Sequence, residues 1–169
     1  YSKSMADIYE KGISVGSMSK TYSLPGLRVG WVCARRDLIN EINKHREYNT
    51  ISVSILDDYF SALALENRDK IAQRNQEILK NGLSILTEWL NGEIYIKSNL
   101  PQGGTTAILR YKKDIPSKQL CRDLYKKTGV ALLPGETMEI EGTVRLGFCV
   151  APDTLKTGLE LFSKYLRTI

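Results

Sequence analysis

Two short apolar runs enclose a polar, basic stretch, and this arrangement constrains the fold more than any other feature of the sequence. Residues 12–16 read GISVG and residues 29–34 read VGWVCA, whereas the stretch from Ser17 to Arg28 carries serines, a lysine, an arginine and a Leu-Pro-Gly turn. Apolar or small residues on both faces are typical of strands in a parallel or mixed sheet that is covered on both sides. The sequence therefore predicts buried strands at 13–19 and 27–34. Lys20 and Arg28 would lie at their ends, where an unpaired buried charge is costly.

Composition narrows the class of protein. The chain has 169 residues, of which 42% are hydrophobic and 25% charged, so it can bury a core and reads as a soluble globular protein. Its net charge of +5 comes from basic residues that alternate with acidic ones, which favours solvated helix faces over nucleic-acid binding. No apolar run is long enough to span a membrane. Three separated cysteines, Cys33, Cys121 and Cys149, and a single histidine, His45, favour neither a disulfide framework nor a metal site, and reduced thiols suit the cytoplasm.

The pattern along the chain predicts an α/β protein in three parts. Residues 1–53 are expected to be the end of a large α/β domain, residues 54–92 a long connecting helix or two helices, and residues 93–169 a small α+β domain. Because the sequence begins without Met and reaches a core-like strand almost at once, we expect a natural protein that is longer at its N-terminus. Further elements are predicted as helices at 37–48 (capped by Asp37), 117–129 and 151–169, and as strands at 93–98, 104–112 and 142–150.

The polar stretch has the chemistry of a phosphate site. Arg28 can offer a bidentate fork, and the hydroxyls of Ser17 and Ser19 can offer single hydrogen bonds to a dianionic phosphate. Lys20 would then lie near that phosphate, where an amine can act as a nucleophile toward an aldehyde. A P-loop is excluded because its glycine spacing is missing. Spacing alone leaves a phosphate site and a solvated turn equally open.

The stretch SMSKTYSLPGLRVGW closely resembles the Schiff-base lysine signature of the class I/II aminotransferases, which have the type I pyridoxal-phosphate fold. It contains the signature's Ser-x-Ser-Lys, its apolar-Pro-Gly turn and its Arg-x-Gly. The resemblance implies pyridoxal 5′-phosphate as cofactor and Lys20 as the catalytic lysine that forms the Schiff base with it. It also implies that Ser17 and Arg28 bind the cofactor phosphate, with Ser19 a weaker candidate for the same role.

A second stretch, LLPGETMEIEGTVRLGF, resembles the family's C-terminal pattern, in which a strand carries a substrate-binding arginine. Val144, Leu146 and Phe148 alternate onto one face of that strand, so Arg145 faces the other way. Periodicity alone favours a surface arginine that pairs with Glu139 or Glu141. The resemblance instead implies that Arg145 binds the α-carboxylate of an amino acid.

The function that the resemblance implies is transamination between an amino acid and a 2-oxo acid, by a cytoplasmic homodimer with no nucleic-acid or membrane partner. The family's pyridine-nitrogen aspartate, ring-oxygen residues and glycine-rich phosphate loop precede the lysine and have no match here, so this chain is expected to be inactive alone. Two alternatives stay open. One is another type I enzyme, such as a C–S lyase, a decarboxylase or a synthase, and the other is a non-catalytic effector-binding domain of a transcription regulator.

Overall fold

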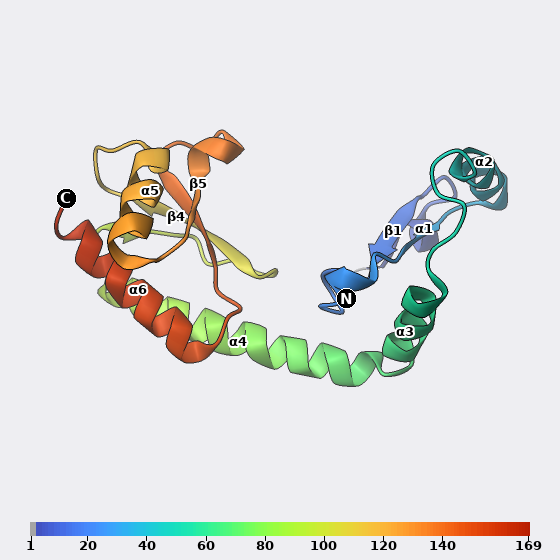
Figure 1. Cartoon of the computed structure of the whole chain (residues 1–169), viewed down its shortest axis with the longest axis horizontal. Helices are drawn as coiled ribbons and strands as arrows, with labels where there is room; N and C mark the ends of the chain where they lie inside the picture. The colour runs from blue at the N-terminus through green and yellow to red at the C-terminus, as the bar shows by residue number, and fades with distance from the viewer. Residues whose placement is uncertain (1–2) are drawn as a thin grey trace. The chain divides into compact units, whose positions relative to one another are not determined.

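The computed structural model describes residues 3–169, and these form two compact units (Figure 1). One unit ends at Asn75 and the other runs Gln76–Ile169. The helix α4 (Arg68–Gly92) contains the boundary between them.

The first unit contains the two predicted strands, but not as a covered sheet. Strands β1 (Ser14–Ser17) and β2 (Gly30–Cys33) form a two-stranded antiparallel sheet in which Ser17 pairs with Gly30. Every residue of β2 is exposed, and Val15 of β1 is 77% exposed. The prediction of buried strands in a parallel or mixed sheet is therefore wrong for the described residues. The apolar pattern shows that both faces of each strand can be covered, but it does not show which strands pair. Here the chain turns back between β1 and β2, so the two strands pair with each other in antiparallel.

The helices of the first unit are α1 (Met5–Ile8), α2 (Arg36–Arg46), α3 (Ile55–Glu66) and the start of α4, with a 3₁₀ turn η1 (Pro25–Leu27) between the strands. The predicted helical region thus consists of two helices, separated at Asn67, and Ser54 caps the first by accepting a bond from the Asp57 amide. Asp37 is not the cap of α2. It lies in the first turn of that helix, where its carboxylate pairs with Arg35 at 2.7 Å.

The second unit is built on a four-stranded antiparallel sheet in the order β3-β4-β6-β5. Its strands are β3 (Ile96–Lys97), β4 (Thr106–Tyr111), β5 (Leu133–Pro134) and β6 (Thr143–Gly147). Its helices are α5 (Ser117–Thr128) and α6 (Pro152–Leu166), with a 3₁₀ turn η2 (Gly135–Met138). Strands β3, β4 and β6 and helices α5 and α6 each lie within a predicted element, whereas β5 and η2 fall between the predicted elements. Strand β3 is shorter than predicted because the Tyr95 amide donates to the Glu93 carboxylate and not to a neighbouring strand.

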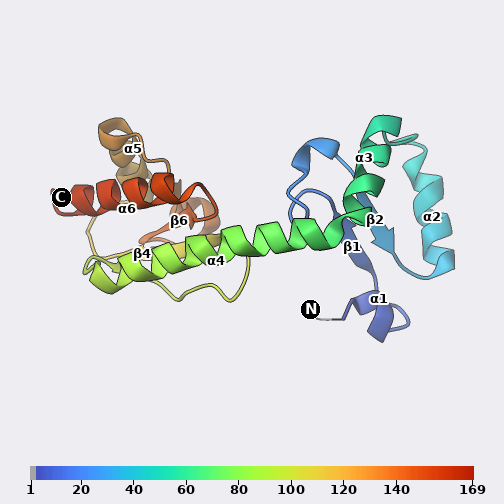
Figure 2. The ribbon, with the colours of Figure 1, turned by 90° about the horizontal axis from the view of Figure 1, so that it is seen from below.

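The main hydrophobic core lies in the second unit, where α4, α5 and α6 pack with the sheet (Figure 2). Its fully buried members include Leu86, Leu109, Leu120, Val144 and Phe148. Helix α6 runs beside α4, and the ring of Trp89 stacks on that of Phe162 with 6.1 Å between centroids.

A buried carboxylate joins these two helices. Glu93, just after α4, accepts hydrogen bonds from the Ser163 hydroxyl of α6 and, at 3.0 Å, from the Tyr95 amide. The Ser163 oxygen in turn accepts the Trp89 indole N–H at 2.8 Å. Each of these buried polar groups therefore has a partner, which is the usual condition for tolerating a buried charge.

Candidate active site

The loop that follows β1 carries most of the predicted site residues, and one buried side chain anchors it. Met18 is fully buried although its neighbours Ser17 and Lys20 are exposed. Its amide donates to the Val29 carbonyl, and its carbonyl accepts the Leu24 amide, both at 3.0 Å. Burying a methionine side chain stabilises by about 1.5–3 kcal/mol, so Met18 fixes the loop while its flanking residues stay accessible.

A second anchor comes from α4. The side-chain amide of Asn75 donates to the Thr21 carbonyl at 2.8 Å and so holds the residue next to Lys20. Sequence reasoning missed this contact because it joins residues 54 positions apart. Met18 could have been found, since it is an apolar residue inside a polar run.

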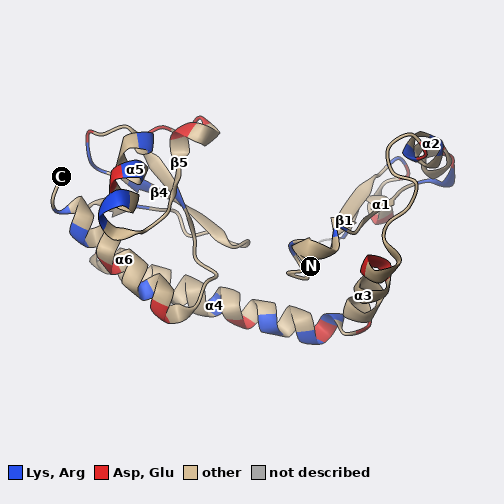
Figure 3. Cartoon of the chain, viewed as in Figure 1, with Lys and Arg blue, Asp and Glu red and all other residues tan. Residues whose placement is uncertain are grey.

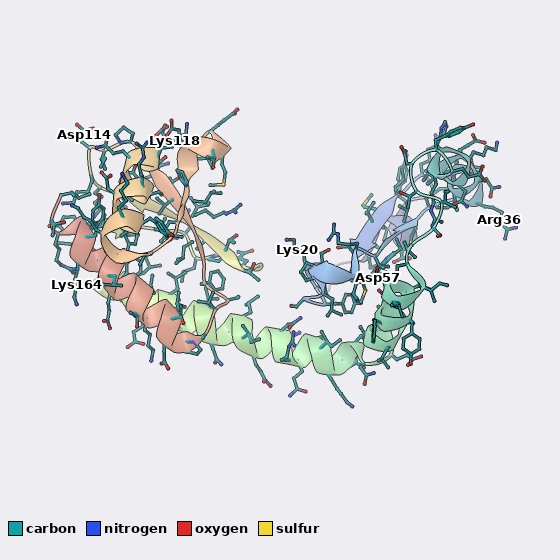
Figure 4. The ribbon with its side chains drawn as sticks, viewed as in Figure 1. Lys20, Arg36, Asp57, Asp114, Lys118 and Lys164 are labelled. Carbon is teal, nitrogen blue, oxygen red and sulfur yellow. The ribbon has the colours of Figure 1, made fainter. Side chains whose placement is uncertain are left out.

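The donors on this loop are accessible and largely unused. Figure 4 labels Lys20, whose ammonium makes no hydrogen bond or ion pair with any described residue. The Ser17 oxygen accepts the Ser19 amide at 3.3 Å, which leaves its O–H free to donate. The sequence interpretation placed Lys20 and Arg28 as buried cations, and this is wrong: both are exposed, because no layer of described residues covers the β1–β2 sheet.

Arg28 adopts an unusual backbone conformation. Its φ of 51° lies in the left-handed region, which side chains other than glycine adopt at a cost of about 1–2 kcal/mol. One guanidinium N–H donates to the Pro25 carbonyl at 2.6 Å, across the η1 turn. Since a guanidinium has five N–H donors, four are left for another acceptor.

The stretch of sequence that carries these donors is basic. From Lys11 to Arg36 the sequence contains five basic residues and no Asp or Glu (Figure 3). Arg35 pairs with Asp37, a residue just after this stretch. Lys20 and Arg28 have no carboxylate partner among the described residues. A loop with a free ammonium, a free fork of guanidinium donors and a free hydroxyl has the donor set that an organic phosphate requires.

Arg145 lies in the second unit, on β6. Its neighbours Val144 and Leu146 are buried, whereas Arg145 is exposed, as the alternation predicts. No ion pair among the described residues joins Arg145 to Glu139 or Glu141, so the alternative of a paired surface arginine is wrong. The guanidinium is therefore available to a carboxylate. Arg145 and Lys20 belong to different units.

The thiols do not extend this site. Burial raises the pKa of Cys121 to about 11 and also raises the pKa of Cys149, so both remain protonated and weakly nucleophilic at neutral pH. Cys33 is exposed. Within residues 3–169, no group of three or more His, Cys, Asp or Glu side chains is arranged to hold a metal ion, and no helix is both long and apolar enough to cross a bilayer.

The chain is similar in sequence and in structure to known proteins that use pyridoxal phosphate or are named as aminotransferases or synthases. A crystal structure of a PLP-dependent aminotransferase from Streptococcus suis matches with a TM-score of 0.92 and 39% identity, over 96% of this chain and 43% of that one. Capreomycidine synthase from Streptomyces vinaceus is 34% identical over 94% of this chain and 41% of its own length. A probable N-acetyl-LL-diaminopimelate aminotransferase from Bacillus subtilis is 27% identical, over 89% and 39%. This chain thus spans about two fifths of the length of these relatives.

The structural match confirms the predicted fold class, an α/β chain with the fold of the C-terminal part of a type I pyridoxal-phosphate enzyme. The family model for aminotransferase class I and II matches residues 3–162, which include the loop of Lys20 and the strand of Arg145. The chain belongs to the class I and II aminotransferase family.

Proposed function

We propose that the protein is a pyridoxal-phosphate-dependent aminotransferase, which exchanges the amino group of an amino acid with a 2-oxo acid and works as a cytoplasmic homodimer. The observation that carries this proposal is the unpaired ammonium of Lys20, held on the same acid-free stretch of chain as the free donors of Ser17 and Arg28. Family membership supports the class of reaction.

The donor set of the loop fits the cofactor. Arg28 and Ser17 would hold its phosphate, with Ser19 as a further hydroxyl, and Lys20 would bind its aldehyde carbon through Nζ. Pyridoxal phosphate, when bound, supplies an electron sink that stabilises negative charge at the substrate Cα. The anchors at Met18 and Asn75 keep these donors in place before the cofactor arrives.

Two residues would act on the amino acid. Arg145 would bind its α-carboxylate, because a planar guanidinium matches a carboxylate with two parallel hydrogen bonds. Lys20, once released from the cofactor, would carry the proton that leaves Cα, acting as general base and then as general acid. An amine can perform both steps because its protonated and neutral forms differ by one proton on a single atom, Nζ.

Substitution of Lys20 in the whole protein tests the assignment. Lys20→Ala and Lys20→Arg should both abolish the cofactor's lysine-bound absorbance band and transamination, because arginine keeps the charge but does not condense with the aldehyde. Lys126→Ala, at an exposed position on α5 with no hydrogen-bond or ion-pair partner among the described residues, should change neither. Normal turnover by Lys20→Arg would refute the role given to Lys20.

A second candidate is a synthase or cyclase of the same family. It is favoured by the likeness to capreomycidine synthase and by a match to the PLP-dependent cyclase OrfR, with a TM-score of 0.86 and 26% identity. The two candidates differ in their products. An aminotransferase releases one equivalent of 2-oxo acid per site when given an amino acid without an acceptor, whereas a cyclase releases a cyclic amino acid and no oxo acid.

We further propose that residues 1–53 belong to the large cofactor-binding domain, 54–92 to a connecting helical segment and 93–169 to the small domain. This chain matches only about two fifths of each relative, so the 169-residue chain alone should show no transamination. Measuring transamination by the whole protein and by the 169-residue chain in parallel tests this prediction. Turnover by the 169-residue chain would contradict it.

A further inference from the structure

The second unit contains a pocket of about 650 Å³ beside the edge strand β3. It is lined by the end of α4, by β3 and the residues that follow it, by β4, and by Ile140 and Thr143 before and at the start of β6. Its walls carry two cations, several uncharged polar groups and a set of apolar side chains. No Asp or Glu lines it.

The two cations face the pocket from neighbouring strands. Lys97 on β3 pairs directly with Arg110 on β4, so their side chains leave the same face of the sheet. Both are exposed. Directly opposed like charges destabilise a strand pair. An anion bound between Lys97 and Arg110 would offset this repulsion and stabilise the strand pair.

Neither cation is neutralised by the rest of the unit. Arg110 donates one N–H to the Glu141 carbonyl at 3.1 Å, and the Glu141 carboxylate makes no ion pair with it. No hydrogen bond or ion pair holds the Lys97 ammonium among the described residues. The nearby Glu93 carboxylate is buried and already accepts from Ser163 and the Tyr95 amide. Four guanidinium donors and one ammonium thus remain for a ligand.

The remaining walls set the kind of ligand. Leu90, Leu100, Ile108 and Ile140 give the pocket apolar surface, of which Leu100 is 43% and Ile140 39% exposed. A fork of guanidinium donors suits a carboxylate, and apolar walls favour a hydrocarbon body attached to it.

We propose that this pocket binds an organic acid with an apolar body, its carboxylate held between Lys97 and Arg110. The inference stands whether or not Lys20 binds a cofactor, because every residue that it uses lies in the second unit. An alternative role for Lys97 is to prevent the edge strand β3 from pairing with a strand of another chain. That role needs no ligand, so it predicts no binding of an organic acid.

Titration of the isotopically labelled 169-residue chain with 4-methylpentanoate, followed by NMR, tests the proposal. We expect saturable shifts at the Arg110 Nε–H and at the amides of residues 97–100. The uncharged amide 4-methylpentanamide should bind about tenfold or more weakly, because it lacks the charge-assisted bonds, and acetate should also bind more weakly, because it lacks the apolar body.

Variants locate the site. Lys97→Gln and Arg110→Gln should each weaken 4-methylpentanoate binding about tenfold or more. The matched variants Lys126→Gln and Arg122→Gln, which remove exposed charges from α5, should leave it unchanged. Backbone spectra of each variant verify that the unit is folded.

Three outcomes overturn the proposal. The first is an absence of saturable shifts, and the second is equal affinity for the acid and its amide. The third is loss of binding in Arg145→Gln but not in Lys97→Gln, which would place the acid at the arginine already assigned to substrate.

Discussion

A buried glycine in α4 offers a sharp test of how the second unit is packed. A Cβ added at Gly82 would lie 2.2 Å from the Phe148 carbonyl oxygen and 3.1 Å from its carbonyl carbon. Both are backbone atoms of a residue that is itself fully buried and whose amide donates to the Thr105 carbonyl at 3.0 Å. Neither α4 nor the chain after β6 can therefore move away cheaply.

The size of the effect follows from two opposing terms. Alanine favours a helix over glycine by about 1 kcal/mol. Relieving the clash requires a separation of about 1 Å between two packed backbones, so its cost lies in the upper part of the range for overpacking, about 2–3 kcal/mol. We expect Gly82→Ala to lower the free energy of unfolding of the second unit by about 1–2 kcal/mol. For a unit of this size, that corresponds to a fall in Tm of roughly 5–15 °C.

Gly158 is the matched control. It also lies inside a helix, α6, but a Cβ added there would meet nothing within 4 Å. Gly158→Ala should therefore stabilise by about 0.5–1 kcal/mol. Urea unfolding in a Trp31→Phe background measures both, because Trp89 then remains as the sole tryptophan and reports the second unit. A Gly82→Ala variant as stable as Gly158→Ala would refute the packing argument.

Three further predictions concern Glu93 and the thiols. Glu93→Ala should cost about 3–5 kcal/mol, because the Ser163 hydroxyl and the Tyr95 amide each lose a bond to a charged acceptor, while Glu93→Gln should cost about 1–2 kcal/mol. Urea unfolding measures both, and equal losses would show that the charge of Glu93 is unimportant. Burial raises the Cys121 pKa from 9.0 to about 11, so the folded state holds this proton more tightly than the unfolded state. Its contribution to stability is therefore complete below about pH 9 and lost as pH rises to about 11. Unfolding curves measured over a series of pH values test this: in Cys121→Ala the free energy of unfolding should fall less between about pH 9 and pH 11. An equal fall in the variant would contradict the raised pKa of Cys121. At neutral pH a thiol reagent should modify Cys33 in the folded chain, and Cys121 only after unfolding.

Local sequence patterns predicted most of the elements. Helical periodicity and end signals gave α4, α5 and α6, and the alternation around Arg145 placed it on the exposed side of β6. These predictions succeed because periodicity and turn chemistry act within a few residues. The signature around Lys20 likewise identified the candidate lysine and its companions, because it is one continuous stretch.

Burial and long-range contacts could not be predicted in the same way. The apolar strands at 13–19 and 27–34 were expected to be covered, yet β2 is exposed and β1 alternates between half-buried and exposed residues, because a pattern shows which residues tolerate burial and not which layer covers them. The anchoring of Thr21 by Asn75 and the opposition of Lys97 and Arg110 also join segments that are separate in the sequence.

The sequence by itself determined the family, the candidate lysine and the order of helices and strands. Only the tertiary structure decided that Lys20 and Arg28 are accessible donors, that Arg145 lacks an acidic partner, and that two opposed cations border a pocket. The physical reason is that charge pairing and burial depend on distances between strands and helices, and those distances are set by packing of the whole unit.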